Sequence, residues 1–204
     1  MQLKKLGVKV VLNAEIKADD PVLKSADAIF VATGSKSVMP KIPGIDNKKV
    51  VDVVDIHKNG MPEGERVVIC GGGLSACDTA IEYAAKGGRK FTIVEMLPQL
   101  ASDVMVVNKI SIDRLLNEYG VEQLTSTKVI GITYEGVEVE HEGEKRVIPA
   151  DVIVAAFGRG RSLELADAVQ NEYPTKTVII GDCMKPAKAG NAIREGFYAA
   201  MSLK

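Results

Sequence analysis

The sequence predicts an α/β protein in which a parallel sheet with an antiparallel β-meander is inserted into a second, truncated unit. Three observations support this fold class: a glycine-rich turn between a strand-like and a helix-like run, an alternation of apolar and polar residues over 128–149, and an internal repeat. The 204 residues suffice for one large domain or two small ones with a proper core. We expect the inserted unit at residues 59–158 and the interrupted unit at residues 1–58 and 159–204.

The glycine-rich turn follows the apolar run 67–70 and opens a helix-like stretch that extends to about residue 86. Its G-x-G-x-x-A spacing is typical of a dinucleotide-binding turn in a Rossmann-like sheet. The first glycine allows a tight turn, the second glycine of the motif lets the main chain approach a pyrophosphate, and the helix N-terminus favours a diphosphate. The alternative is a glycine turn that binds nothing. The residues concerned are Gly71, Gly72, Gly73, Leu74, Ser75 and Ala76.

An acidic residue, Glu95, follows the next strand-like run, Lys90–Val94. At this position a carboxylate accepts hydrogen bonds from the hydroxyls of an adenosine ribose. A 2′-phosphate placed there would meet a like charge, at a cost of about 4 kcal/mol for two unit charges 4 Å apart at an intermediate dielectric constant. We therefore expect NADH to be preferred over NADPH. Gly158, at the end of a later strand, is a further expected NAD-binding residue.

The remaining periodic segments predict the other elements of the two units. Strands are expected at residues 50–54, 128–149 (the meander, with turns at Glu135-Gly136 and Glu142-Gly143) and 177–180, and helices at 104–119 and 189–203. The helix at 104–119 is expected to turn its apolar residues into the core. These residues are Val107, Ile110, Ile112, Leu115 and Leu116.

An internal repeat relates the two units. Residues 27–34 match residues 151–158 in order: an aspartate, an apolar strand and a closing glycine. In both copies, the segment upstream runs from a helix end through a glycine, Gly7 or Gly120, into a strand. The second copy has the glycine-rich turn far ahead of Gly120, whereas residues 1–6 alone precede Gly7. We therefore expect the first unit to lack its front end and the chain to be part of a longer protein. The alternative is a peripheral hairpin at residues 1–34.

Composition narrows the class of partner. The formal net charge is −1, from 26 Lys and Arg against 27 Asp and Glu, which gives no electrostatic case for nucleic acid or an anionic membrane. No apolar run is long enough to span a bilayer, and the first residues lack the apolar core of a secretory signal. We expect a cytoplasmic protein with small-molecule partners, and the oligomeric state stays open.

Cysteine and histidine give no sign of metal or nucleophilic chemistry. The odd count of three cysteines, Cys70, Cys77 and Cys183, contains no C-x-x-C pair, so buried thiols are expected. His57 and His141 stand alone and are interpreted as ordinary surface or loop residues. No catalytic acid, base or nucleophile is predicted, and no metal site.

The ordered motifs resemble the two-dinucleotide-binding flavoprotein reductases. Within that superfamily, Asp78 and the tail at 188–200 are most similar to the C-terminal half of the NADH:flavin oxidoreductase, enoate reductase and 2,4-dienoyl-CoA reductase group. The resemblance rests on residues 31–35, Ile42-Pro43-Gly44, residues 71–80, Glu95, residues 150–158 and Gly181-Asp182-Cys183.

This resemblance implies the cofactors. NADH would bind residues 65–158, and FAD would bind the interrupted unit through Thr33, Gly34 and Asp182. Hydride would pass from NADH to FAD, and electrons onward through an iron–sulfur cluster to FMN. The cluster and the FMN would belong to an N-terminal barrel that is not in this sequence.

The sequence departs from the family pattern in several places, and it contains no C-x-x-x-x-C redox pair. The first glycine fingerprint, which would hold the FAD pyrophosphate, is absent, so the chain by itself is expected to be colourless. The loop Arg159-Gly160-Arg161-Ser162 replaces the usual Arg-Pro-Asn and is expected to be more mobile. Two alternatives stay open: a free-standing NAD-binding module without catalysis, and a fragment of a pyridine nucleotide-disulfide reductase whose cysteine pair lies elsewhere.

Overall fold

The computed structural model describes residues 2–203 and divides them into two compact units. The central unit is Ser37–Arg159, and the split unit combines the described residues up to Lys36 with those from Gly160 onward. The first boundary lies earlier than the predicted one at residue 58, because strand β3 (Val50–Asp52) pairs within the sheet of the central unit. In residues 2–203, no helix has the length and apolar character needed to cross a membrane.

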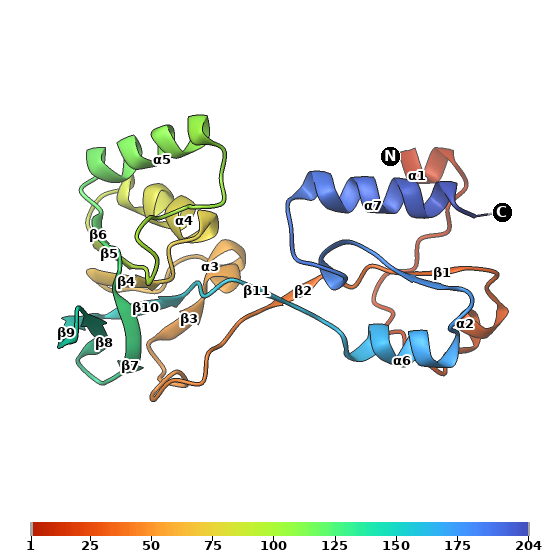
Figure 1. Ribbon diagram of the computed structural model, residues 1–204, viewed down its shortest axis with the longest axis horizontal. Coiled ribbons are helices and arrows are strands. Elements are labelled where there is room, and N and C mark those ends of the chain that lie inside the picture. The colour runs from red at the N-terminus through yellow and green to blue at the C-terminus, as the bar shows by residue number, and fades with distance from the viewer. Residues whose placement is uncertain (1, 204) are drawn as a thin grey trace. The chain divides into compact units, whose positions relative to one another are not determined.

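The central unit contains a five-stranded parallel sheet (Figure 1). Two of the predicted strands, 67–70 and 90–94, are confirmed within one residue. Cys70, at the end of one of them, lies beside both Val94 and Ala155 in register. The carboxyl ends of three neighbouring strands therefore meet at one edge of the sheet. In spatial order the strands are β3, β10 (Val152–Ala155), β4 (Arg66–Cys70), β5 (Lys90–Val94) and β6 (Glu122–Leu124).

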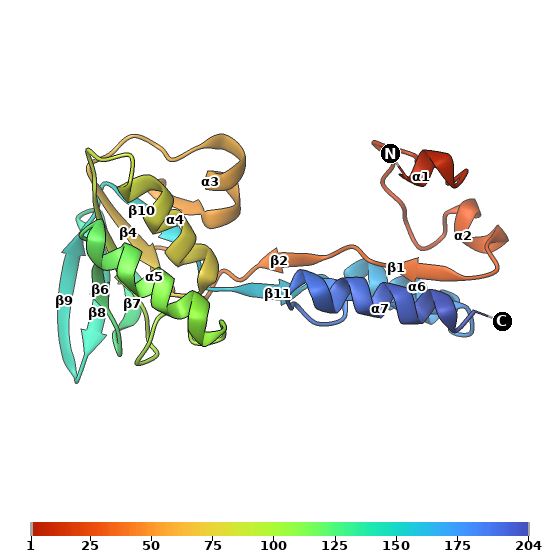
Figure 2. The same ribbon diagram turned by 90° about the horizontal axis from the view of Figure 1, so that it is seen from above.

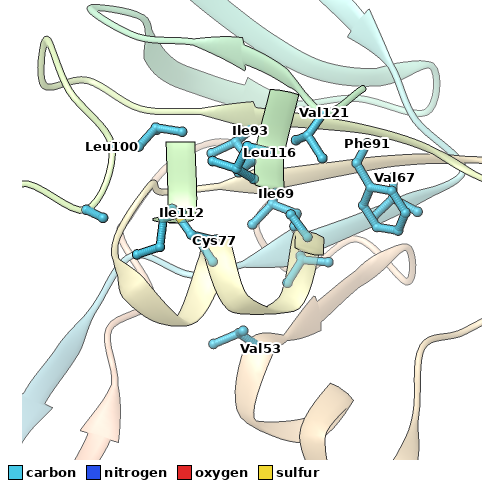
Figure 3. Close-up of a cluster of buried hydrophobic side chains, with 14 of the residues drawn as sticks. Val53, Val67, Ile69, Cys77, Phe91, Ile93, Leu100, Ile112, Leu116 and Val121 are labelled. Carbon is cyan, nitrogen blue, oxygen red and sulfur yellow. The ribbon is translucent and has the colours of Figure 1, made fainter. Parts of the chain in front are cut away.

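Three helices cover one face of this sheet and enclose the larger core, shown in Figure 3. Helix α4 ends at Ala84, two residues before its predicted end. In helix α5, Ile112 and Leu116 are buried as predicted, but Val107 and Ile110 are 63% and 64% exposed, so their assignment to the core is wrong. At about 100° per residue, Val107 and Leu116 lie on opposite sides of the helix. The helices are α3 (Val53–Asn59), α4 (Leu74–Ala84) and α5 (Val106–Glu118).

The predicted antiparallel meander covers the other face. Strands β7 (Lys128–Ile132), β8 (Gly136–His141) and β9 (Glu144–Pro149) form it, and apolar residues of β7 and β8 pack against the sheet. The turn at Glu142-Gly143 is confirmed, with φ values of 51° and 86° that suit a tight hairpin. The other turn lies slightly earlier than predicted, because Gly136 already pairs with Pro149.

The split unit is built on two short parallel strands. Strand β1 (Ile29–Val31) pairs with β12 (Thr177–Ile179), and helices α6 (Glu164–Glu172) and α7 (Ala189–Met201) lie on opposite sides of β1 (Figures 1 and 2). The chain leaves this unit along β2 and returns along β11, and these two strands pair. The remaining elements are α1 (Gln2–Lys5), α2 (Pro21–Ser25), β2 (Ser35–Ser37), β11 (Arg159–Arg161) and the 3-10 helix η1 (Gly181–Cys183).

Many apolar side chains of the split unit are exposed. The expected strand after Gly7 does not form: Val8, Val10 and Leu12 are exposed and outside any strand. An isolated strand would leave its main-chain polar groups unpaired, and the described part of the chain places no strand beside this segment. The predicted final helix is present as α7, but Phe197 on its apolar side is 60% exposed. In β1, Ile29 and Val31 on one face are buried, whereas Phe30 on the other face is 36% exposed, because α7 buries none of its own residues there.

Candidate dinucleotide-binding site

The glycine turn between β4 and α4 admits no side chain at its first position. Gly71 has a φ of +105°, and a Cβ atom there would lie 2.3 Å from the main-chain oxygen of Ala156. This contact is shorter than any real Cβ makes, and the left-handed φ disfavours other residues. The turn therefore holds β4 close against the end of β10.

Gly72 is enclosed by the segment that follows β5. A Cβ atom at Gly72 would lie 2.4 Å from Leu100 Cδ2 and 2.8 Å from Glu95 Cβ. The Gly72 N–H donates to Glu95 Oε2 at 2.6 Å, and the Gly72 carbonyl accepts a bond from the Ala101 N–H at 2.7 Å. Gly72 thus fixes the turn against the segment after β5 and does not border the open side of the turn.

Gly73 has the opposite surroundings. A Cβ atom there would find no other atom within 4 Å, and its φ of −69° suits any residue. Gly73 is also the N-cap of α4, and no side chain caps the first N–H groups of that helix. Free N–H groups at a helix N-terminus attract anions. The open space at Gly73 is therefore suited to a phosphate.

Glu95 lies directly beside the turn. Its two carboxylate oxygens accept one main-chain bond each, from Gly72 N–H at 2.6 Å and from Leu97 N–H at 2.8 Å. Each oxygen keeps a further lone pair, because an ionised carboxylate has about four acceptor positions. A fixed acid with spare acceptor capacity is suited to bind vicinal hydroxyls of a sugar.

A hollow of about 410 Å³ opens at this edge of the central unit. It brings together four of the predicted NAD-binding residues: Gly71, Gly73, Glu95 and Gly158. The other four do not line it. Ala76 is buried in the core, Gly72 is buried behind the turn, and Leu74 and Ser75 are exposed at the start of α4.

Sequence reasoning missed several lining residues that follow other strands. Lys128 is the only cation in the lining, Thr127 is 2% exposed, and Phe157 follows β10. Each lies close after the carboxyl end of a strand in the same sheet, so the rule that placed Glu95 could have found them. To apply that rule one must know which strands are neighbours in the sheet, and the sequence alone does not give this order.

The predicted FAD-binding residues also come together, within the split unit. The Thr33 hydroxyl donates to Cys183 Sγ at 3.3 Å, and Gly34 follows with a φ of +79° and open space around it. Asp182 accepts from the Ser35 hydroxyl at 3.0 Å and from the Ala187 N–H at 3.2 Å. These residues follow the carboxyl ends of β1 and β12, as the resemblance implies.

The thiols are placed as expected. All three cysteines are buried, and desolvation raises the pKa of Cys70 and Cys77 to about 12, so both stay protonated at neutral pH. The Cys183 thiol donates to the Ser162 carbonyl at 3.2 Å. Within residues 2–203, no group of His, Cys, Asp and Glu is arranged to hold a metal ion.

Comparison with known proteins identifies the family. NADH oxidase of Thermoanaerobacter brockii is 30% identical over 207 residues, which cover 99% of this chain and 32% of that protein. Cinnamate reductase of Clostridium sporogenes is 30% identical over 204 residues, with 98% and 30% covered. The structure of a 2-naphthoyl-CoA reductase with 2-naphthoyl-CoA matches 100% of this chain and 31% of its own, with a TM-score of 0.89 and 34% identity.

The chain spans about a third of the length of these relatives. The sequence profile described as pyridine nucleotide-disulphide oxidoreductase matches residues 1–196, across both units. The fold class and the wider family predicted from the motifs are thereby confirmed. The chain belongs to the pyridine nucleotide-disulphide oxidoreductase family.

Proposed function

We propose that the central unit binds NADH and that the chain is the part of a longer reductase that passes hydride from NADH to FAD. One observation carries the proposal: a hollow at the carboxyl edge of the parallel sheet is bordered by an open glycine, an uncapped helix N-terminus and a fixed acid. These are the groups that a dinucleotide needs for its diphosphate and its ribose.

Each group has a separate task in this proposal. The main chain at Gly73 and the first N–H groups of α4 hold the diphosphate, and Glu95 holds the adenosine ribose. Residues 156–158 complete the lining beside Gly71. The dinucleotide and the flavin supply the redox chemistry, and the protein supplies binding and orientation. No side chain of this chain has to act as an acid, a base or a nucleophile.

The split unit is proposed to hold part of the FAD. The internal repeat makes β1 the counterpart of β10, and β10 pairs on both sides, with β3 and with β4. Among the strands of residues 2–203, β1 pairs with β12 alone, which leaves its other edge open to a further strand. We propose that in the longer protein this edge pairs with a strand that leads into the glycine fingerprint for FAD. Beside β1, that strand would occupy the position that β4 occupies beside β10.

The final electron acceptor is proposed from the relatives. Cinnamate is an unsaturated carboxylate and 2-naphthoyl-CoA is an aromatic thioester, so two relatives are named for conjugated acyl compounds. We propose an acceptor of this enoate or enoyl class, reduced in a further domain with FMN and an iron–sulfur cluster. This domain would lie outside the present chain.

The alternatives have less support. A disulphide reductase needs a reactive thiol pair; the thiols of this chain are buried, and two have a strongly raised pKa, so the pair would have to lie outside this chain. A free-standing NAD-binding module would account for the central unit but not for Thr33, Gly34 and Asp182 at the ends of β1 and β12.

The test is a calorimetric titration of the 204-residue chain with NADH and with NADPH. We expect one saturable site per chain and tighter binding of NADH. Absence of NADH binding would refute the proposal. A longer native protein that carries the free-edge strand is expected to purify yellow with FAD and to bleach on addition of NADH, whereas the present chain is expected to be colourless.

A further inference from the structure

We propose that His141 positions the adenosine end of the dinucleotide site by holding the corner at residues 125–127, between β6 and β7. The inference rests on the proposed function, and it assigns a role to a histidine that the sequence pattern presented as an ordinary surface residue. His141 is the last residue of β8 and is exposed. It does not line the hollow, so it would act through the corner.

The contacts of His141 define the direction of its hydrogen bonds. Its Nδ1 atom lies 3.1 Å from the Ser126 carbonyl oxygen and 3.2 Å from Thr127 Oγ1. A carbonyl oxygen only accepts, so Nδ1 carries the proton. The Thr127 hydroxyl gives its own proton to the Thr125 carbonyl at 2.8 Å, and its oxygen is then an acceptor for the same Nδ1–H. One N–H group therefore joins two consecutive residues of the corner.

The corner needs such a restraint because of its backbone. Ser126 has a φ of +49°, in the left-handed region that residues other than glycine adopt at a cost. A conformation of this kind persists only where surrounding bonds hold it. On one side the Ser126 N–H donates to the Leu97 carbonyl at 2.9 Å, and on the other His141 binds the Ser126 carbonyl.

The corner in turn fixes the wall of the site. The Thr127 N–H donates to the Glu95 carbonyl at 2.9 Å, and Thr127 and Lys128 both line the hollow beside Glu95. A shift of Ser126 and Thr127 would move the main chain that carries Glu95. His141 is thus a positioning residue for the acid that holds the adenosine ribose.

The second histidine provides a matched control. His57 is also exposed, and its Nε2 atom also contacts a threonine hydroxyl, that of Thr79 at 3.3 Å. His57 belongs to α3, whose residues do not line the hollow. Removal of His57 therefore tests the loss of a histidine–threonine contact elsewhere in the same unit.

The experiment compares His141→Ala, His141→Asn, His141→Gln and His57→Ala by titration with NADH and with 5′-AMP. Loss of one hydrogen bond at an exposed position is expected to raise both dissociation constants about five-fold in His141→Ala. His57→Ala should bind as the wild type does. Asn places an N–H near the position of Nδ1 and should restore binding, whereas Gln places it farther out and should not.

Two results would overturn the inference: unchanged affinity in His141→Ala, or equal rescue by Asn and Gln, which would indicate packing alone. Amide hydrogen exchange at Ser126 and Thr127 supplies a readout that needs no ligand, and it should accelerate in His141→Ala. If the wild type fails to bind NADH, the proposed function fails. Unchanged hydrogen exchange in His141→Ala would then separately overturn the proposal that His141 holds the corner at residues 125–127.

Discussion

Glu95 accepts a hydrogen bond of 2.6 Å from the main-chain N–H of Gly72, so the acid at the end of β5 and the glycine turn at the end of β4 form one structural unit. Charge-assisted bonds of this length are strong. The acid that would bind the ribose is therefore fixed relative to the turn that would bind the diphosphate. Predictions about affinity and about coenzyme choice follow from this pair and its surroundings.

Replacement of Glu95 by arginine is expected to weaken NADH binding and to improve NADPH binding. The change removes the acceptor for the ribose and supplies a cation for a 2′-phosphate, so the ratio of the two dissociation constants should shift at least about ten-fold. Titration with both coenzymes measures it. Glu95→Gln is the control, since it loses the charge without gaining a cation. An unchanged ratio in Glu95→Arg would show that this acid does not select the coenzyme.

Gly73→Val is expected to abolish binding of both coenzymes while the protein stays folded. A side chain there points into open space, but valine is a poorer N-cap than glycine, so the free energy of unfolding should fall by about 1 kcal/mol only. The branched side chain would occupy the place proposed for the diphosphate. Thermal unfolding and NADH titration of the same sample separate the two effects. Wild-type affinity in the valine variant would contradict the proposed site.

Gly71→Ala, in contrast to Gly73→Val, should act mainly on stability. Its Cβ atom would meet the Ala156 carbonyl, and its φ of +105° is unfavourable for alanine, so we expect a loss of about 3 kcal/mol or more in stability. Denaturant unfolding measures this loss. A stable alanine variant would mean that the turn can rearrange without disturbing the end of β10.

Lys128→Gln is expected to weaken NADH binding a few-fold and to reduce its dependence on salt. Lys128 is the only cation that lines the hollow, and a diphosphate brings negative charge into it. Titrations at low and high ionic strength test this. Lys145→Gln is the matched control, because Lys145 is an exposed lysine of the same meander that does not line the hollow. Equal effects of the two changes would exclude a local role for Lys128.

Stability is expected to fall in alkali between about pH 9 and pH 12. Burial raises the pKa of Cys70 and Cys77 from 9.0 to about 12, so the unfolded chain loses these protons at a lower pH than the folded one. Each thiol then lowers the free energy of unfolding by about 1.4 kcal/mol per pH unit within this window. Denaturant unfolding across the range measures the slope. Cys70→Ala should reduce this slope. An unaltered slope would show that the pKa of Cys70 is the same in the folded and the unfolded chain.

The parts of the fold that the sequence predicted well are those controlled by local chemistry. Strand Lys90–Val94 and the turn at Glu142-Gly143 follow from runs of apolar residues and from residues that accept a positive φ. The position of Glu95 beside the turn follows from the parallel order of two successive strands.

Other features depend on contacts that no local pattern shows. Val107 and Ile110 fit an apolar helix face, but α5 presents a different side to the sheet. The run after Gly7 has the residues of a strand but no neighbour to pair with. Lys128 lines the site, and His141 contacts the corner at 125–127, because the meander folds back toward the segment after β6, and this packing is long-range.

The enclosed position of Gly72 affects the kinetics of coenzyme association. Its N–H and carbonyl are both bonded to the segment after β5, and its Cα is enclosed by Leu100 and Glu95. The turn is therefore preorganised before any ligand arrives, and little conformational entropy remains to be lost on association. Stopped-flow measurements should accordingly show a single bimolecular phase whose rate rises linearly with coenzyme concentration, without the plateau that a slow rearrangement would impose.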